Sequence, residues 1–183
     1  MRARGFLSAL ALLLVSVAPV VADPGDHSSF NLNLIGGVGG SPDVEEGDGF
    51  RNTGYQVGFS LVREPGTLVG VRVGKLDLDD KDRFANLTET ELTYAVAGGE
   101  YLFNEGYYIS GVFLGLGAYR LDGQRIGLGG DSEETAIGGT LSLSGEFAMT
   151  RSLAIRIEVA GHYTDLEAAQ LFGTAHAGLS LHF

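Results

Sequence analysis

Apolar side chains alternate with polar or small ones through the last residues of the chain, and the alternation continues to the terminus. Ala175, Ala177, Leu179, Leu181 and Phe183 fall on one parity, and small or polar residues fall between them. A period of two is the repeat of a β-strand whose two faces meet different environments. A soluble domain rarely ends on such a strand with an aromatic final residue, so this ending limits the folds that fit the chain.

Seven earlier runs alternate in a similar way, at 29–37, 54–62, 67–76, 92–103, 107–121, 135–147 and 153–163. Long and short connections follow one another, and the first short one carries the turn pair Pro65-Gly66. Strands of about 9–11 residues with this loop pattern are typical of barrels that cross a bilayer. The sequence therefore predicts an all-β fold, an eight-stranded antiparallel up-and-down transmembrane barrel in which 175–183 pairs with 29–37.

Alternation does not decide which face looks inward, and a secreted, soluble, lipocalin-like carrier with an apolar cavity is the alternative. A water-facing surface needs many charged residues, whereas the polar parity here holds mostly Gly, Ser, Thr and Asn. Lys75 and Lys81 are the only lysines of the sequence, and it has no Trp. These features favour an apolar face turned to lipid and a narrow polar interior. The parity of run 107–121 stays open, because Leu114 and Leu116 share one face while Phe113 and Tyr119 share the other.

Residues 1–22 have the parts of a cleaved signal peptide, followed by a barrel domain at 23–183. Arg2 and Arg4 precede an apolar core over 6–17 that is short for a membrane helix, and Ala22 offers a cleavage site. The formal net charge of −11 argues against a nucleic-acid partner. The chain has no cysteine, which excludes disulfides and Cys-zinc sites. We expect no cofactor.

The mature chain resembles the small eight-stranded bacterial outer-membrane β-barrels of the OmpA/OmpX-like class. The resemblance lies in the architecture and in the terminal GLSLHF, where Gly178, Leu179, Leu181 and Phe183 would form the assembly signal. It implies a monomer in the outer membrane that contacts membrane lipids and lipopolysaccharide. During biogenesis it would meet the barrel assembly machinery and periplasmic chaperones. The chain departs from full-length OmpA because no peptidoglycan-binding domain follows Phe183.

Aromatic residues gather where the predicted short turns lie, as they do at membrane interfaces. The predicted girdle consists of Phe30, Tyr101, Phe103, Tyr107, Phe147 and Phe183. A sparser ring at the opposite end would hold Tyr119, Tyr163 and Phe172.

Charged residues and histidines fall on the inward parities of the predicted strands. They are Arg72, Glu100, Glu146, Arg156, Glu158, His162, His176 and His182. An eight-stranded barrel is about filled by its side chains, and a buried ion without a partner costs several kcal/mol. We therefore expect the two arginines and three glutamates to form a paired network that plugs the lumen, with a narrow gated pore as the alternative.

The resulting function is a structural role in envelope integrity, or a surface interaction in which acidic loops bind an external ligand. We expect no catalytic residues. The alternative is an outer-leaflet enzyme, because His162 and Thr164 loosely resemble the His-x-Ser segment of lipid A deacylases. Asp77, Asp79, Asp80 and Asp82 suggest calcium, but their order does not match an EF-hand, so we expect a solvated loop and no metal site.

Overall fold

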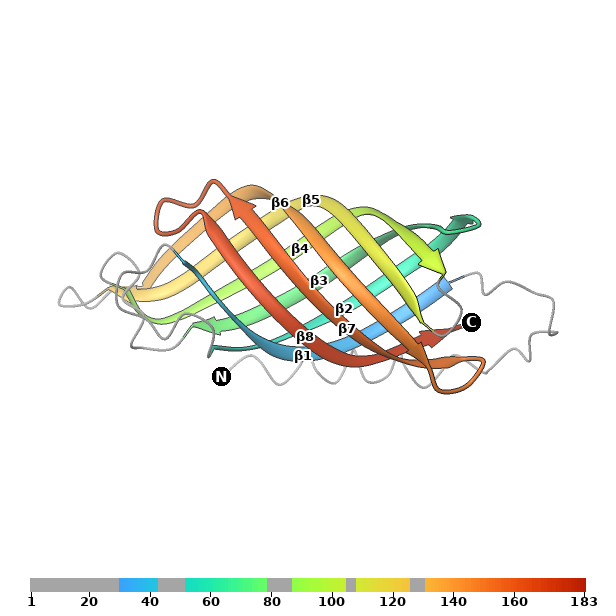
Figure 1. Ribbon diagram of the computed structural model, residues 1–183. Coiled ribbons are helices and arrows are strands. Elements are labelled where there is room, and N and C mark those ends of the chain that lie inside the picture. The colour runs from blue at the N-terminus through green and yellow to red at the C-terminus, as the bar shows by residue number, and fades with distance from the viewer. Residues whose placement is uncertain (1–29, 43–51, 79–86, 105–107, 126–130) are drawn as a thin grey trace.

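The computed structural model describes residues 30–42, 52–78, 87–104, 108–125 and 131–183, and it is an all-β closed barrel (Figure 1). Eight antiparallel strands follow one another around the barrel in sequence order, as predicted. They are β1 (Phe30–Gly40), β2 (Asn52–Glu64), β3 (Thr67–Leu78), β4 (Leu87–Asn104), β5 (Ile109–Arg125), β6 (Asp131–Ala148), β7 (Leu153–Thr164) and β8 (Leu171–His182). None of the described residues belongs to a helix of the length and apolarity that crossing a bilayer requires. The predicted signal peptide lies outside the described residues.

The first and last strands close the sheet along their whole length. Their register runs from Asn31 opposite His182 to Gly40 opposite Gly173. The backbone N–H of Phe183 donates to the carbonyl of Phe30 at 3.0 Å, and the two aromatic rings stack with centroids 4.9 Å apart. Closure leaves no strand at an open edge along this seam.

The two ends of the barrel differ in their connections. The β2–β3, β4–β5 and β6–β7 turns lie at one end together with the chain terminus, at the right of Figure 1. Gly66 takes a positive φ of 80° in the two-residue β2–β3 turn, a conformation that glycine adopts without steric cost. The strand ends that flank the other four connections lie at the opposite end, which we call the loop end.

Three neighbouring strands extend beyond the predicted runs at the loop end. β4 and β6 have 18 residues against predicted runs of 12 and 13, and β5 has 17 against 15. The prediction was wrong because the added residues at the loop end are polar on both parities. Ion pairs hold this extension together: Arg120 contacts Asp122 at 2.9 Å and Glu133 at 3.0 Å. The loop-end extensions of β4, β5 and β6 therefore project beyond the other strands, and we call this part of the sheet the raised wall.

The outward parity is apolar on every strand. Exposed residues include Phe59, Val71, Leu114, Leu116, Leu141, Leu143, Ile157, Val159 and Leu179. This settles the open parity of β5, because Leu114 and Leu116 are 67% and 71% exposed while Phe113 and Tyr119 are buried. A barrel with this surface belongs in an apolar solvent.

Inward glycines make room for the large side chains inside. A Cβ built on Gly74 would lie 2.2 Å from the Tyr94 ring, and one on Gly138 would lie 2.7 Å from the Tyr119 ring. The expected outer ring of Tyr119, Tyr163 and Phe172 is therefore wrong for two of its members. Tyr119 and Phe172 are fully buried in the lumen, and Tyr163 alone faces outward.

Candidate functional site

The centre of the lumen holds two arginines that share three glutamates. Arg156 is almost fully buried and contacts Glu100 at 2.7 Å, Glu146 at 2.8 Å and Glu158 at 2.7 Å. Arg72 contacts Glu100 at 3.1 Å and Glu158 at 2.7 Å from the other side. These five side chains, which we call the charge network, come from β3, β4, β6 and β7 and bridge the barrel interior.

Neutral side chains complete the charge network, and the sequence did not single them out. Gln56 donates to Glu158 at 3.1 Å, Ser144 donates to Glu100 at 2.8 Å, and Arg72 donates to Ser142 at 2.7 Å. Their inward parity was visible in the sequence, but polar residues recur on that parity in many strands, so nothing in the sequence marked these three. The Arg72 guanidinium also lies 3.6 Å from the centroid of the Phe113 ring.

The predicted histidines occupy three different settings. His182 lies near the short-turn end, with Nε2 3.2 Å from Glu146. His162 is fully buried and packs against the rings of Tyr94 and Tyr119. His176 is buried too, and neither of its ring nitrogens has a hydrogen-bond partner among the described residues.

The geometry does not pair His162 with Thr164, the hydroxyl that the sequence suggested as its partner. Its Nδ1 lies 2.9 Å from the hydroxyl of Thr140 and 3.2 Å from that of Tyr119. The Thr164 hydroxyl instead donates to the carbonyl of Ala169. Both side chains are buried in the lumen, so neither presents a reactive atom at the lipid-facing surface.

An apolar cluster fills the loop-end half of the lumen, which the sequence had assigned to polar residues. The expectation of a wholly polar interior is wrong for this half. The buried members, which we call the apolar cluster, are Leu76, Leu78, Leu92, Tyr94, Val96, Phe113, Tyr119, Leu121, Leu166, Ala169 and Phe172. Leu166 and Ala169 belong to the β7–β8 connection, so this connection folds into the mouth of the barrel. The residues sit on the inward parity, where alternation alone does not distinguish them from a lipid-facing set.

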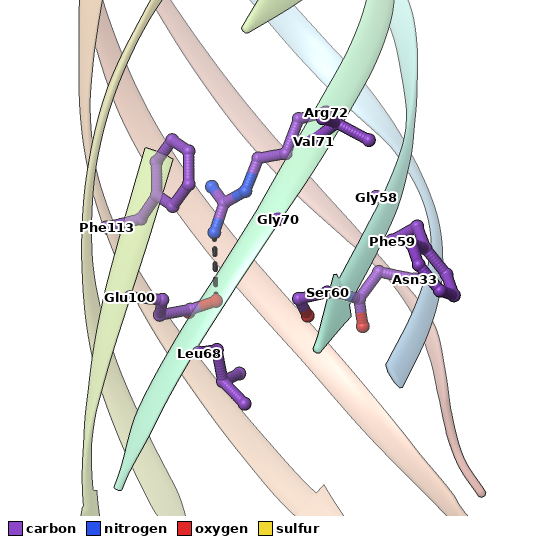
Figure 2. Close-up of a pocket in the computed structure, with 10 residues that line it drawn as sticks. All are labelled: Asn33, Gly58, Phe59, Ser60, Leu68, Gly70, Val71, Arg72, Glu100 and Phe113. Atoms are coloured by element: carbon purple, nitrogen blue, oxygen red, sulfur yellow. Dashed lines mark hydrogen bonds and ion pairs between the residues drawn. The ribbon is translucent and has the colours of Figure 1, made fainter. Parts of the chain in front are cut away.

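A small cavity lined by polar and apolar side chains lies on the short-turn side of the charge network (Figure 2). Arg72 and Glu100 form one side of it and Phe113 lies beside the guanidinium, while Asn33 and Ser60 lie across from them. Asn33 Oδ1 and Ser60 Oγ are buried and lack a hydrogen-bond partner in the part of the chain that the structure describes.

Most of the predicted girdle faces outward at the short-turn end. Tyr101, Phe103 and Phe147 are exposed, and Phe30 and Phe183 are half-buried against each other. Tyr107 lies outside the described residues. Phe59 and Tyr108 also belong to this set, since Phe59 neighbours Phe30 and Tyr108 neighbours Phe147.

The residues of the expected assembly signal occupy both faces of β8. Leu179 and Leu181 lie on the outward parity, whereas Gly178 faces inward against β1. A Cβ on Gly178 would lie 2.1 Å from the Leu34 carbonyl oxygen, so the seam requires a glycine there.

Some of the described acidic groups toward the loop end form ion pairs. Lys75 contacts Asp77 at 3.0 Å and Glu91 at 2.7 Å, which joins β3 to β4. Asp79, Asp80 and Asp82 lie outside the described residues. Among the described side chains, no three His, Cys, Asp or Glu groups converge as a metal site would require.

One edge of the raised wall lacks a partner strand. β6 pairs with β7 only as far as Gly138 opposite Thr164, and residues 131–136 pair with β5 alone within the described chain. The Ile137 carbonyl accepts the N–H of Asp165 on the β7 side. Since backbone groups alternate with a period of two, the N–H groups of Thr135 and Glu133 point to this same free side.

No protein-family model matches the chain, and no curated protein matches it either. Solved structures do match, and they define its class: the chain has the fold of the small eight-stranded outer-membrane barrels.

Neisserial surface protein A superposes with a TM-score of 0.67 at 15% identity, covering 86% of this chain and 99% of that chain. Ail, the attachment invasion locus protein of Yersinia pestis, gives 0.56 at 12% identity, with coverages of 86% and 98%. A major outer membrane protein from Thermus thermophilus gives 0.60 at 9% identity, with coverages of 84% and 98%. At these identities the similarity establishes the fold alone.

Proposed function

We propose that this protein spans the bacterial outer membrane as a closed barrel and binds a partner outside the cell through its raised wall. The carrying observation is the division of its surface. The outward parity along the barrel is apolar, while the extensions of β4, β5 and β6 are polar and rise from the loop end. Lipid-facing strands with loops on the outer side are the layout of outer-membrane barrels.

The barrel itself would serve as an anchor rather than a channel. The charge network and the apolar cluster fill the interior, as expected for eight strands. Lipids and lipopolysaccharide would surround the outward face, and the terminal β8 strand would be the segment that the assembly machinery reads. Two proteins of the same fold carry names that denote a surface protein and an attachment protein, which agrees with a surface role.

The free edge of β6 supports the binding part of the proposal. Unpaired backbone groups on an edge strand can accept another extended segment as an added strand. Asp131, Glu133 and Glu134 lie along this edge. Glu133 also contacts Arg120, and Glu134 accepts the backbone N–H of Glu167, but the three carboxylates still outnumber the one arginine beside them. The fitting partner is therefore an extended segment rich in Lys and Arg, and like charge disfavours pairing between two copies of this edge.

Cell fractionation tests the location. We expect the protein in the outer-membrane fraction, with a heat-dependent shift in gel mobility after detergent extraction. In planar bilayers we expect no large, stable conductance. Recovery from the soluble periplasm, or a reproducible channel of porin size, would contradict the anchor.

A proline substitution tests the edge. Thr135→Pro removes an N–H that points away from β5, so the β5–β6 pairing persists while strand addition is blocked. We expect the refolded wild type to bind a short peptide of alternating Lys and Thr, and Thr135→Pro to weaken this binding. Thr135→Ala is the control, because it changes the side chain and keeps the N–H. Equal binding by all three proteins would refute edge recognition.

A further inference from the structure

The two halves of the lumen differ in polarity. The short-turn half holds the charge network, with Asn31, Ser144 and Ser180 also buried there. The loop-end half holds most of the apolar cluster, together with uncharged or weakly basic polar groups such as His162, Thr164 and His176. An apolar constriction stops ions because it excludes the water that hydrates them. A passage lined by charged groups does not exclude water in this way.

The polar half offers a site for water. Asn33 Oδ1 and Ser60 Oγ both line the cavity beside Arg72 and Glu100, and neither has a hydrogen-bond partner among the described residues. Figure 2 shows the Arg72–Glu100 ion pair on one side of this cavity, with Asn33 and Ser60 on the other. A buried water is held where two to four polar groups converge, and Asn33 Oδ1 and Ser60 Oγ are two polar atoms at this cavity for which a water would supply the missing hydrogen bonds.

Members of the apolar cluster reach across the lumen to the facing walls. Leu76 on β3 reaches across to β1 and β2, because a Cβ on Gly39 or Gly54 would lie 3.0–3.1 Å from its methyl carbon. Tyr119 on β5 covers Gly138 on β6.

The remaining walls are covered in the same way. The Tyr94 ring from β4 lies 4.8 Å from the His162 ring on β7, and the fully buried Phe172 supplies the contribution of β8. All eight strands therefore contact the cluster or belong to it.

We propose that the lumen is a blind vestibule: water binds in the Asn33–Ser60–Arg72–Glu100 cavity, and the apolar cluster is the barrier that separates it from the loop end. The charge network lies on the wet side of the barrier. Its role is to satisfy buried charges, and it does not by itself stop ions.

Silver ions test the vestibule, because the sequence contains no native cysteine. Ag⁺ reacts with thiols and enters spaces open to water. In detergent, where both ends of the barrel are accessible, we expect Ag⁺ to react with the thiol of folded Ser60→Cys. The protein is then denatured and treated with a maleimide, and a thiol that has bound Ag⁺ is not labelled. An unreactive Ser60→Cys in folded protein, as judged by gel mobility, would overturn the proposal.

Vesicles in which the loop ends face outward test the barrier, and this arm alone rests on the membrane-spanning orientation proposed above. External Ag⁺ should reach the exposed Glu133→Cys, which serves as the accessibility control. External Ag⁺ should react with Ser60→Cys at least about tenfold more slowly than with Glu133→Cys, because an apolar constriction excludes hydrated ions. Rapid reaction of Ser60→Cys from this side would overturn the proposal.

Combined variants locate the barrier. Adding Phe172→Ala or Leu76→Ala to Ser60→Cys should let external Ag⁺ react rapidly with the thiol in vesicles. Two alternative sites are used so that the test can still be made if one of the two variants does not fold. Adding Glu100→Gln should leave the thiol protected. Loss of protection with Glu100→Gln and retention with the folded apolar variants would make the charge network the barrier, which is the opposite of the proposal. If the protein did not enter membranes at all, the detergent result would still stand.

Discussion

Removing Arg156 should destabilise the barrel more than any other single charge change. Its guanidinium contacts three carboxylates at 2.7–2.8 Å and is 1% exposed. In Arg156→Met, Arg72 is the one remaining guanidinium of the network for Glu100, Glu146 and Glu158. Breaking a buried ion pair by removing one partner costs about 3–5 kcal/mol, and we expect a loss in the free energy of unfolding of that size at pH 8.

The loss should shrink as the pH falls. The native variant buries three carboxylates with too few cations to balance their charge, which disfavours their charged forms. Stability therefore rises relative to wild type as these groups are neutralised. Urea unfolding in lipid vesicles at pH 8 and pH 5, followed by far-ultraviolet circular dichroism, measures both effects. The chain has no tryptophan to report by fluorescence.

Arg151→Met is the matched control, because Arg151 is exposed in the β6–β7 turn. Exposed substitutions of this kind change stability by about 0.5 kcal/mol or less. A loss below about 1 kcal/mol for Arg156→Met at pH 8, the range of an exposed ion pair, would refute the reasoning that the network is buried and tightly paired.

Three further predictions concern packing, closure and the raised wall. Gly74→Ala places a Cβ against the Tyr94 ring and should cost about 1–3 kcal/mol in urea unfolding, whereas Gly161→Ala, with no atom within 4 Å, should cost less than about 0.5 kcal/mol. Equal effects would show that the ring does not cover Gly74. Phe183→Ala removes the stacked pair with Phe30 and should lower the yield of heat-modifiable barrel in refolding, while Phe183→Tyr should preserve it. A full yield with alanine would contradict a role in closure. Lys75→Met should change stability by about 1 kcal/mol or less, with the difference fading in high salt, because Lys75 is partly exposed. A larger, salt-independent loss would mean that this pair is shielded from solvent.

The sequence predicted the barrel well because its strongest signal, a period of two, is a direct property of lipid-facing strands. The period of two did not predict which face of β5 points inward, because both of its faces are apolar. Phe113 and Tyr119 face inward because Gly98, Gly115 and Gly138 leave space for their rings. The fit between these rings and the glycines depends on neighbouring strands, so the alternation within β5 alone does not predict it.

The members of the charge network were predictable, but their pairing was not. Glu158 lies opposite Ser144 and His176 in the strand register, yet its carboxylate binds Arg72 from β3 across the lumen. Such contacts depend on the stagger of the closed barrel. The raised wall was not predicted for a different reason. Its strands carry polar residues on both faces, so they lack the apolar–polar alternation that marks a strand.

The seam between β1 and β8 has a consequence for how the barrel is made. The pairing that closes the sheet joins Phe30 to Phe183, so the contact with the greatest separation in sequence must form before the last two strand edges are protected. Contacts of this kind form slowly, because a long stretch of chain must be ordered before they contribute. A chain that has lost its last strand would keep two open edges and an apolar surface. Assembly should thus be all-or-none, with no partly built barrel persisting in the membrane.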